Sequence, residues 1–157
     1  MTNTTSPLAS PIRILIVDDH PVVRAGLTSM LGTHAELQVI GSASSGEEAL
    51  AMIELHAPDV VLLDLRMPGL NGIDMLAAAK KNGSQIRAII LTSYETDEDI
   101  YRAVQAGAQG YLLKDTPFKE MLDAIRTVHA GKRYIPRQIA QRLAERMMRT
   151  ELTAREV

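Results

Sequence analysis

The sequence predicts an α/β protein with a doubly wound parallel sheet, and three observations support this fold class. Short runs of aliphatic and β-branched residues alternate five times with segments of helical length. Such alternation is typical of (βα)5 folds, in which right-handed crossovers place helices on both faces of one parallel sheet. Three of the runs are apolar nearly throughout, as in strands that are covered on both faces. The length of 157 residues suits one domain with a short appendage.

The strands are expected at Ile12–Val17, Leu37–Ile40, Val60–Leu63, Ala88–Leu91 and Tyr111–Leu113. Capping signals delimit the helices between them, because proline favours the first helical turn, serine favours the N-cap and glycine favours the left-handed stop. These signals predict helices at Pro21–Gly32, Ser45–Ala57, Ile73–Asn82, Asp97–Ala106 and Pro117–Ala130. Pro136 begins a sixth helix through about Arg149, whose apolar stripe consists of Ile139, Leu143 and Met147.

Composition excludes several classes of protein. Hydrophobic residues make up 46% of the chain and charged residues 23%, as in globular proteins rather than disordered chains. The absence of cysteine excludes disulfide scaffolds, thiolate metal sites and cysteine nucleophiles. No apolar run approaches the ~18 residues of a membrane span, and no secretory signal is visible. We therefore expect a cytoplasmic protein with no membrane partner.

Charge divides the chain near Gly131. Residues 1–131 carry ten basic and sixteen acidic side chains, whereas residues 132–149 carry six basic side chains and one acidic. We therefore expect a flexible leader at 1–11, a main domain at 12–131 and a basic linker helix at 132–150. The acidic main domain has no basic stripe for binding nucleic acid.

Polar side chains follow four of the five predicted strands, at the edge of the sheet where their carboxyl ends meet. These residues are Asp18, Asp19, Asp64, Thr92, Ser93 and Lys114. A single aspartate after a strand is explained well by helix capping or by a turn. The complete set is not, and reactive groups gather at this edge in open α/β sheets. The set therefore predicts a functional site.

The residue types in this set suit phosphoryl transfer. Clustered carboxylates repel one another, and a hard cation such as Mg²⁺ relieves that repulsion with oxygen ligands. Lys114 and Thr92 would bind phosphoryl oxygens. A carboxylate is also a nucleophile that forms an aspartyl phosphate. Asp64 stands alone at its strand end and is the expected nucleophile, with Asp18 and Asp19 holding the metal.

Four stretches carry a family resemblance: IRILIVDDHPVVRAGL, PDVVLLDLRMPGLNGID, IILTSYE and AGAQGYLLKD. They resemble the receiver domain of two-component response regulators, which has the CheY-like (flavodoxin-like) fold with strand order 2-1-3-4-5. The DDHPVVRAGL and GAQGYLLKD forms are similar to the NarL/FixJ-type subfamily. The final residues, 151–157, resemble the start of that subfamily's LuxR-type helix-turn-helix domain, so the chain would be truncated there.

The resemblance assigns roles in phosphorylation and metal binding. It implies that Asp64 is the phosphoacceptor and that Asp19 is a direct ligand of Mg²⁺, for which Mn²⁺ can substitute. Asp18 would hold the metal largely through water, and Arg66 would contribute its backbone carbonyl. His20 is interpreted as a helix-start or kinase-contact residue rather than a ligand, because Mg²⁺ prefers oxygen.

The resemblance also assigns the switch. Thr92 corresponds to the switch hydroxyl, Lys114 to the phosphate-binding lysine and Tyr111 to the switch aromatic, which we expect to rotate inward on phosphorylation. Arg66 and Tyr94, two residues beyond Asp64 and Thr92, would flank the path of hydrolytic water and tune the lifetime of the phosphorylated form.

The function that follows is regulatory rather than enzymatic in the ordinary sense. A sensor histidine kinase would phosphorylate Asp64, the chain would form a homodimer, and transcription would be controlled through a C-terminal DNA-binding domain. Two other functions are less compatible with the sequence. A haloacid-dehalogenase-type phosphatase would need a second aspartate where Arg66 stands. A flavodoxin-like nucleotide or flavin binder would need a phosphate-binding first loop, whereas the loop here is DDHP.

Overall fold

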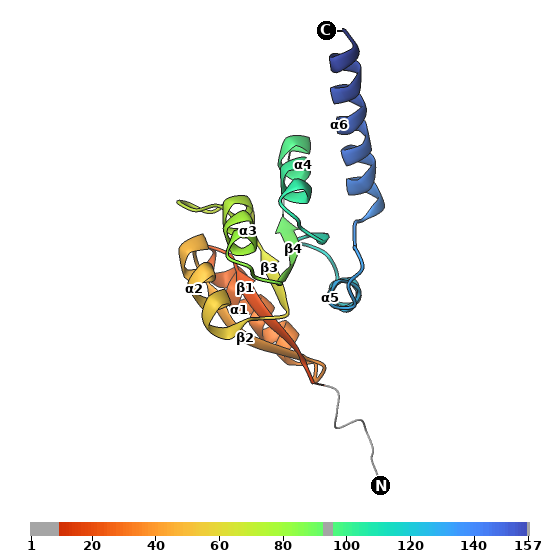
Figure 1. Cartoon of the computed structure of the whole chain (residues 1–157). Coiled ribbons are helices and arrows are strands. Elements are labelled where there is room, and N and C mark those ends of the chain that lie inside the picture. The colour runs from red at the N-terminus through yellow and green to blue at the C-terminus, as the bar shows by residue number, and fades with distance from the viewer. Residues whose placement is uncertain (1–9, 93–95, 157) are drawn as a thin grey trace.

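A computed structural model describes residues 10–92 and 96–156, with side chains to Arg149. Five parallel strands form one sheet in the order β2-β1-β3-β4-β5, which confirms the predicted fold class and strand order (Figure 1). The strands are β1 (Ile12–Val17), β2 (Leu37–Ala43), β3 (Val60–Leu63), β4 (Arg87–Thr92) and β5 (Gly110–Leu113).

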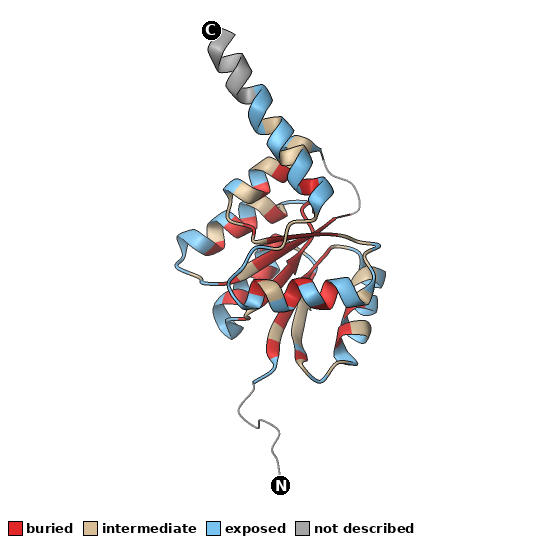
Figure 2. Cartoon of the chain, turned by 90° about the vertical axis from the view of Figure 1, so that its right-hand side faces the viewer, coloured by how far each residue is buried: buried red, intermediate tan, exposed pale blue. Residues whose placement is uncertain are grey.

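Helices cover both faces of this sheet. They are α1 (Pro21–Gly32), α2 (Gly46–His56), α3 (Gly72–Lys81), α4 (Asp97–Gln105), α5 (Phe118–His129) and α6 (Arg137–Glu156). Successive side chains of a strand point to opposite faces. In β1, Ile14 and Ile16 therefore pack in the cluster with α1 and α5, whereas Leu15 and Val17 pack in the cluster with α2, α3 and α4. Figure 2 shows the strands buried between these helical layers.

Local chemistry explains where the helices begin and end. Pro21 occupies the first turn of α1, and Ser45 caps α2 by accepting a hydrogen bond from the backbone of Glu48 at 3.1 Å. The Glu48 carboxylate in turn accepts from the Ser44 backbone at 2.7 Å. Gly131 follows α5 with a positive φ, where a side chain would be strained.

Two boundaries differ from the sequence prediction by more than one residue. β2 continues three residues beyond Ile40, because its register with β1 shifts between Ile14 and Leu15 and pairing resumes at Gly41. α6 continues seven residues beyond Arg149, to Glu156. No helix within the described ranges is long and apolar enough to cross a membrane.

The apolar stripe of α6 docks on the domain to which it belongs. Ile139 is buried in the apolar cluster that also contains residues of α4, and Leu143 packs against this cluster. Met147, by contrast, is 55% exposed. α4 and α6 lie side by side in Figure 1, and their residues are in contact. Only the first part of the stripe therefore has a partner within the described part of the chain.

Gly72 lets α3 start against the end of β3, and we expect Gly72→Ala to destabilise the fold. A Cβ at Gly72 would lie 2.5 Å from the Asp64 carbonyl oxygen and 3.0 Å from Leu65 Cα, and these backbone atoms have little room to adjust. Such overpacking typically costs roughly 1–3 kcal/mol in the free energy of unfolding, which urea titration would measure.

Gly26→Ala is the matched control. Gly26 lies inside α1, and nothing lies within 4 Å of the Cβ that the substitution would add. Alanine should stabilise that helix by roughly 0.5–1 kcal/mol. Equal stability changes in the two variants would contradict the close approach at Gly72.

Candidate functional site

The structure brings the described strand-end residues together at the carboxyl edge of the sheet, whereas Ser93 of the predicted set lies outside the described residues. Asp18, Asp19 and Asp64, together with His20, each offer a ligand atom within 4.8 Å of the others. The Lys114 ammonium lies 2.9 Å from Asp18 Oδ2 and 3.4 Å from Asp64 Oδ2. A cation of the protein thus stands between two carboxylates from neighbouring strands.

Backbone pairing continues past the strand ends and fixes these positions. The backbone amide of Asp18 donates to the carbonyl of Ala43 at 3.1 Å, and the backbone amide of Asp64 donates to the carbonyl of Val17 at 2.9 Å. The amide of Lys114 donates to the carbonyl of Thr92 at 2.8 Å. The site residues are therefore held by the sheet itself rather than by mobile loops, which favours a preorganised site.

Burial separates the members of the site. Asp18, Asp64 and Thr92 are the buried polar or charged residues of the described chain, at 2%, 5% and 2% exposure. Asp19 is partly exposed, and the side chain of Lys114 is 18% exposed. Burying a carboxylate is costly unless it is paired, so the Lys114 ammonium is the natural counter-ion.

The two buried carboxylates have opposite pKa shifts. Burial raises the pKa of Asp64 above its ordinary value, and the Asp18 charge adds to that effect, although Lys114 opposes it. Burial also acts to raise the pKa of Asp18, but Lys114 and the hydrogen bonds from His20 outweigh it, so the pKa is lowered. The same carboxylates raise the pKa of Lys114 despite the opposing effect of its burial.

The acidic cluster has the donor chemistry that a divalent cation requires. Asp18 Oδ2 and Asp19 Oδ1 are buried carboxylate oxygens, and the cationic groups next to them are the Lys114 ammonium at 2.9 Å and the His20 ring nitrogen at 3.0 Å. Oxygen ligands of this kind suit Mg²⁺ and Mn²⁺. The residues of the site therefore fit a hard cation held by Asp18, Asp19 and Asp64.

His20 is located at the start of a helix, as predicted, and its side chain also contacts two of the acids. It is the N-cap residue of α1, and its ring Nδ1 lies 2.9 Å from Asp18 Oδ1 and 3.0 Å from Asp19 Oδ1. Arg24 of α1 also donates to the Asp18 carbonyl oxygen at 2.7 Å. Sequence reasoning did not place Arg24 at the site, although a basic residue one turn into the helix after the acidic pair was a usable signal.

Tyr111 is already buried in this structure. Its side chain is 1% exposed, and its hydroxyl donates to the Ile100 carbonyl of α4 at 2.8 Å. The aromatic side chain for which we predicted an inward rotation is thus already buried here. Tyr94, the other predicted tyrosine, lies outside the described residues.

Arg66 extends from the site to α4. Its backbone amide donates to Asp64 Oδ1 at 3.2 Å, and its guanidinium pairs with Asp99 of α4 at 2.5 Å. The predicted neighbour of the phosphoacceptor is therefore also a link to another helix. Sequence reasoning gave no role to Asp99, because the pair joins residues 33 positions apart.

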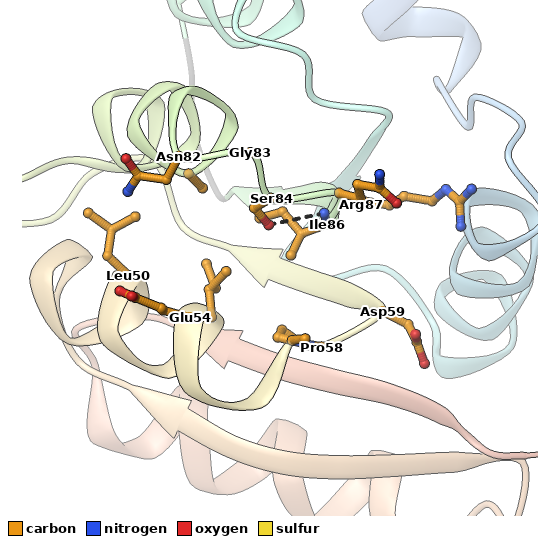
Figure 3. A pocket seen from close by; sticks show the side chains of 13 residues that line it. Leu50, Glu54, Pro58, Asp59, Asn82, Gly83, Ser84, Ile86 and Arg87 are labelled. Carbon is orange, nitrogen blue, oxygen red and sulfur yellow. Dashed lines mark hydrogen bonds between the residues drawn. The ribbon is translucent and has the colours of Figure 1, made fainter.

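A separate hollow of about 900 Å³ lies at the opposite edge of the sheet. Figure 3 shows that it is lined from the ends of α2 and α3 and from the starts of β3 and β4, by residues such as Glu54, Pro58, Asn82 and Ile86. None of the strand-end carboxylates or Lys114 lines it, so this hollow is separate from the candidate site.

Sequence comparison assigns the family. The family model described as the response regulator receiver domain matches residues 14–126, which include Asp18, Asp64 and Lys114. The chain belongs to this family, which confirms the resemblance seen in its motifs.

Individual relatives agree with this assignment. Response regulator GacA of Pseudomonas viridiflava is 47% identical over 133 residues, which are 85% of this chain and 62% of that protein. The crystal structure of response regulator ChrA, from a heme-sensing two-component system, has a TM-score of 0.73 and 41% identity and covers 87% of this chain and 65% of that one. A LuxR-family two-component response regulator from Aurantimonas sp. SI85-9A1 has a TM-score of 0.81 and 32% identity, with coverages of 88% and 99%. The chain thus spans less than two thirds of the length of the GacA relative.

The opposite pKa shifts predict opposite stability changes when the charges are removed. In a buffer with chelator, Asp64→Asn should raise the free energy of unfolding at about pH 7, because the ionised Asp64 is destabilised by folding. This advantage should vanish below pH 3.8, the ordinary carboxyl value, where Asp64 is protonated in both states. Urea titration at several pH values measures this difference in the free energy of unfolding between the variant and the wild type.

Asp18→Asn provides the matched comparison. Since folding lowers the pKa of Asp18, its ionised form contributes stability above pH 3.8 that is lost as the pH falls through the folded-state pKa. The variant should be less stable than the wild type at about pH 7, with a smaller difference in acid. A loss of stability for Asp64→Asn together with a gain for Asp18→Asn would contradict the assigned electrostatics.

Proposed function

We propose that this chain is the receiver part of a phosphorylation-activated response regulator, which takes a phosphoryl group from a sensor histidine kinase on Asp64. The observation that carries the proposal is the buried Asp64 carboxylate, which lies 3.4 Å from the Lys114 ammonium and beside two further acids. A nucleophile, a phosphate-binding cation and a metal-binding pair thus meet at one sheet edge. The protein is a regulator that promotes its own phosphorylation and dephosphorylation, rather than an enzyme acting on a separate substrate.

Asp18, Asp19, Asp64 and the backbone carbonyl of Arg66 would hold the metal, which we propose is Mg²⁺ with Mn²⁺ as a substitute. Bound there, the cation would neutralise charge on the phosphoryl oxygens during in-line transfer. The clustering of the three carboxylates, whose ligand atoms lie within 4.8 Å of one another, supports this ligand set.

The transfer itself needs little beyond positioning. An oxygen of Asp64 bonds to phosphorus while the phosphorus–nitrogen bond to the kinase histidine breaks, and the imidazole nitrogen keeps the bonding electrons. Lys114 binds one phosphoryl oxygen, for which it must leave part of its present pairing with Asp18 and Asp64. The Thr92 hydroxyl donates to another.

Thr92 and Tyr111 would transmit the change. They lie on adjacent strands, where Thr92 pairs with Leu113 and Tyr111 pairs with Ile90. Movement of Thr92 toward the phosphoryl group would alter the space around Tyr111 and its hydrogen bond to Ile100 of α4. Such a rearrangement need shift a two-state equilibrium by only a few kcal/mol.

Arg66 and Tyr94 would control the lifetime of the phosphorylated form by flanking the path of the hydrolytic water. The Arg66 side chain is 62% exposed at the mouth of the site. If the half-life of the phosphorylated form is unchanged in both Arg66→Ala and Tyr94→Ala, this role is excluded.

The output would be homodimerisation, which in the whole protein would bring paired DNA-binding domains onto half-sites and regulate transcription. The similarity to a LuxR-family response regulator supports an output of this class. In this proposal residues 1–11 are the leader, 132–150 the linker and 151–157 the start of the DNA-binding domain. DNA binding would reside in that domain alone. Specific operator binding by residues 1–157 would contradict this division.

Intact-mass spectrometry after incubation with Mg²⁺ and a small-molecule phosphodonor tests the proposal. We expect one phosphoryl adduct, located on Asp64 by fragmentation, and a loss of adduct when chelator is in excess. Asp64→Asn should give no adduct.

Asp59→Asn is the control, since Asp59 is a carboxylate at the opposite end of β3. It should be phosphorylated like the wild type. An undiminished rate in chelator would exclude the metal mechanism, and an adduct of equal yield on Asp64→Asn would exclude Asp64 as the acceptor.

A further inference from the structure

The first turn of α4 carries three successive acids, Asp97, Glu98 and Asp99, which we call the acidic turn. Its N-cap is Thr96, whose hydroxyl accepts a hydrogen bond from the Asp99 backbone at 3.1 Å. The helix dipole favours acidic residues at a helix N-terminus, so it accounts for the presence of the three acids. The helix dipole does not account for the ion pairs that these three side chains form.

Three arginines of α6 reach the acidic turn. Arg142 and Arg149 pair with the two carboxylate oxygens of Asp97 at 2.7 and 3.1 Å, and Arg146 pairs with Glu98 at 2.8 Å. Each exposed ion pair contributes little alone, but networks of several charges contribute more. Together with buried Ile139, they hold α6 along α4 (Figure 1).

Arg146 makes a second contact with α4, because its guanidinium lies 4.1 Å from the centre of the Tyr101 ring. The third acid, Asp99, is held from the other side by Arg66, two residues beyond the phosphoacceptor. The acidic turn is therefore shared between the phosphoacceptor loop and α6.

The start of α6 is fixed elsewhere. Tyr134 donates its backbone amide to Gln109 at 2.9 Å and accepts from the amide of Tyr111 at 2.9 Å, beside β5. α6 begins three residues later, at Arg137. The start of α6 is anchored beside β5 and its middle is anchored to α4. When α4 moves relative to β5, α6 therefore cannot keep both contacts, and if it stays with β5 the arginine contacts break.

Resting on the phosphorylation of Asp64 proposed above, we propose that the contact between α6 and the acidic turn is an intramolecular latch that phosphorylation releases. The phosphoryl group adds about 1.5–2 negative charges beside Arg66 and competes with Asp99 for its guanidinium. Thr92 at the end of β4 is drawn toward the same group. Both changes displace the start of α4, and the doubly anchored α6 separates from it.

Release and phosphorylation must be coupled in both directions, because coupling between two sites is reciprocal. The double substitution Arg142→Glu and Arg146→Glu, which we call the α6 reversal, places like charges opposite the acidic turn and should release α6 without phosphorylation. The control is Lys132→Glu with Arg133→Glu, which changes the net charge equally at two exposed residues before α6.

The chain has no cysteine, so a pair of introduced cysteines takes spin labels without background. We place them at the exposed positions Gln105 of α4 and Ala144 of α6 and measure their separation by double electron–electron resonance. The unphosphorylated chain and the control should give one narrow distribution. Phosphorylation, or the α6 reversal alone, should lengthen and broaden it.

Equilibrium binding of beryllofluoride, a phosphoryl analogue, with Mg²⁺ gives the reciprocal measurement. The α6 reversal should bind it about fivefold tighter or better, and the control should match the wild type. Asp97→Arg and Glu98→Arg added to the reversal place opposite charges at both reversed pairs, and should move the distribution and the affinity back toward the wild-type values.

Intact mass keeps the two proposals distinguishable. If the adduct forms on Asp64 while the label separation stays unchanged, the latch is overturned and the phosphorylation function stands. Affinity that is equal in the reversal and the wild type also overturns the latch. Absence of any adduct overturns the proposed function and, with it, the latch that rests on it.

Discussion

The Lys114 ammonium between Asp18 and Asp64 is the interaction on which the rest of the site depends. The sheet brings carboxylates from β1 and β3 to one edge and buries both, and without a counter-ion this would be unfavourable. Lys114, from β5 on the far side of β4, lies within 3.4 Å of both. The same ammonium stabilises the resting fold and, in the proposed reaction, binds the phosphoryl oxygen.

Charge also links this edge to the helical layer. Arg66 joins the loop after β3 to the start of α4, and α6 reaches the same turn of α4 from the other side. Tyr111 adds a hydrogen bond to Ile100 from within the core. In the proposed switch, a change at Asp64 therefore has two routes to α4, one through surface charge and one through buried packing.

The sequence allowed the strands and the strand-end site to be predicted, because apolar runs and capping signals are local and parallel strands present their carboxyl ends at one edge. The length of β2 was predicted too short, since it depends on a register shift against β1. The pairing of Arg142 with Asp97 was not predictable, because it joins residues 45 positions apart whose approach depends on the finished fold. The buried state of Tyr111 likewise depends on its tertiary contact with α4.

The most direct measurement is the free energy of unfolding of Lys114→Met, a variant that removes the charge and keeps most of the length of the unbranched side chain. With chelator present at about pH 7, we expect a loss of roughly 1–3 kcal/mol relative to the wild type. Addition of Mg²⁺ should restore more stability to this variant than to the wild type, because the cation replaces the missing positive charge. Unchanged stability in chelator, with no larger gain from Mg²⁺, would show that the carboxylates do not depend on Lys114.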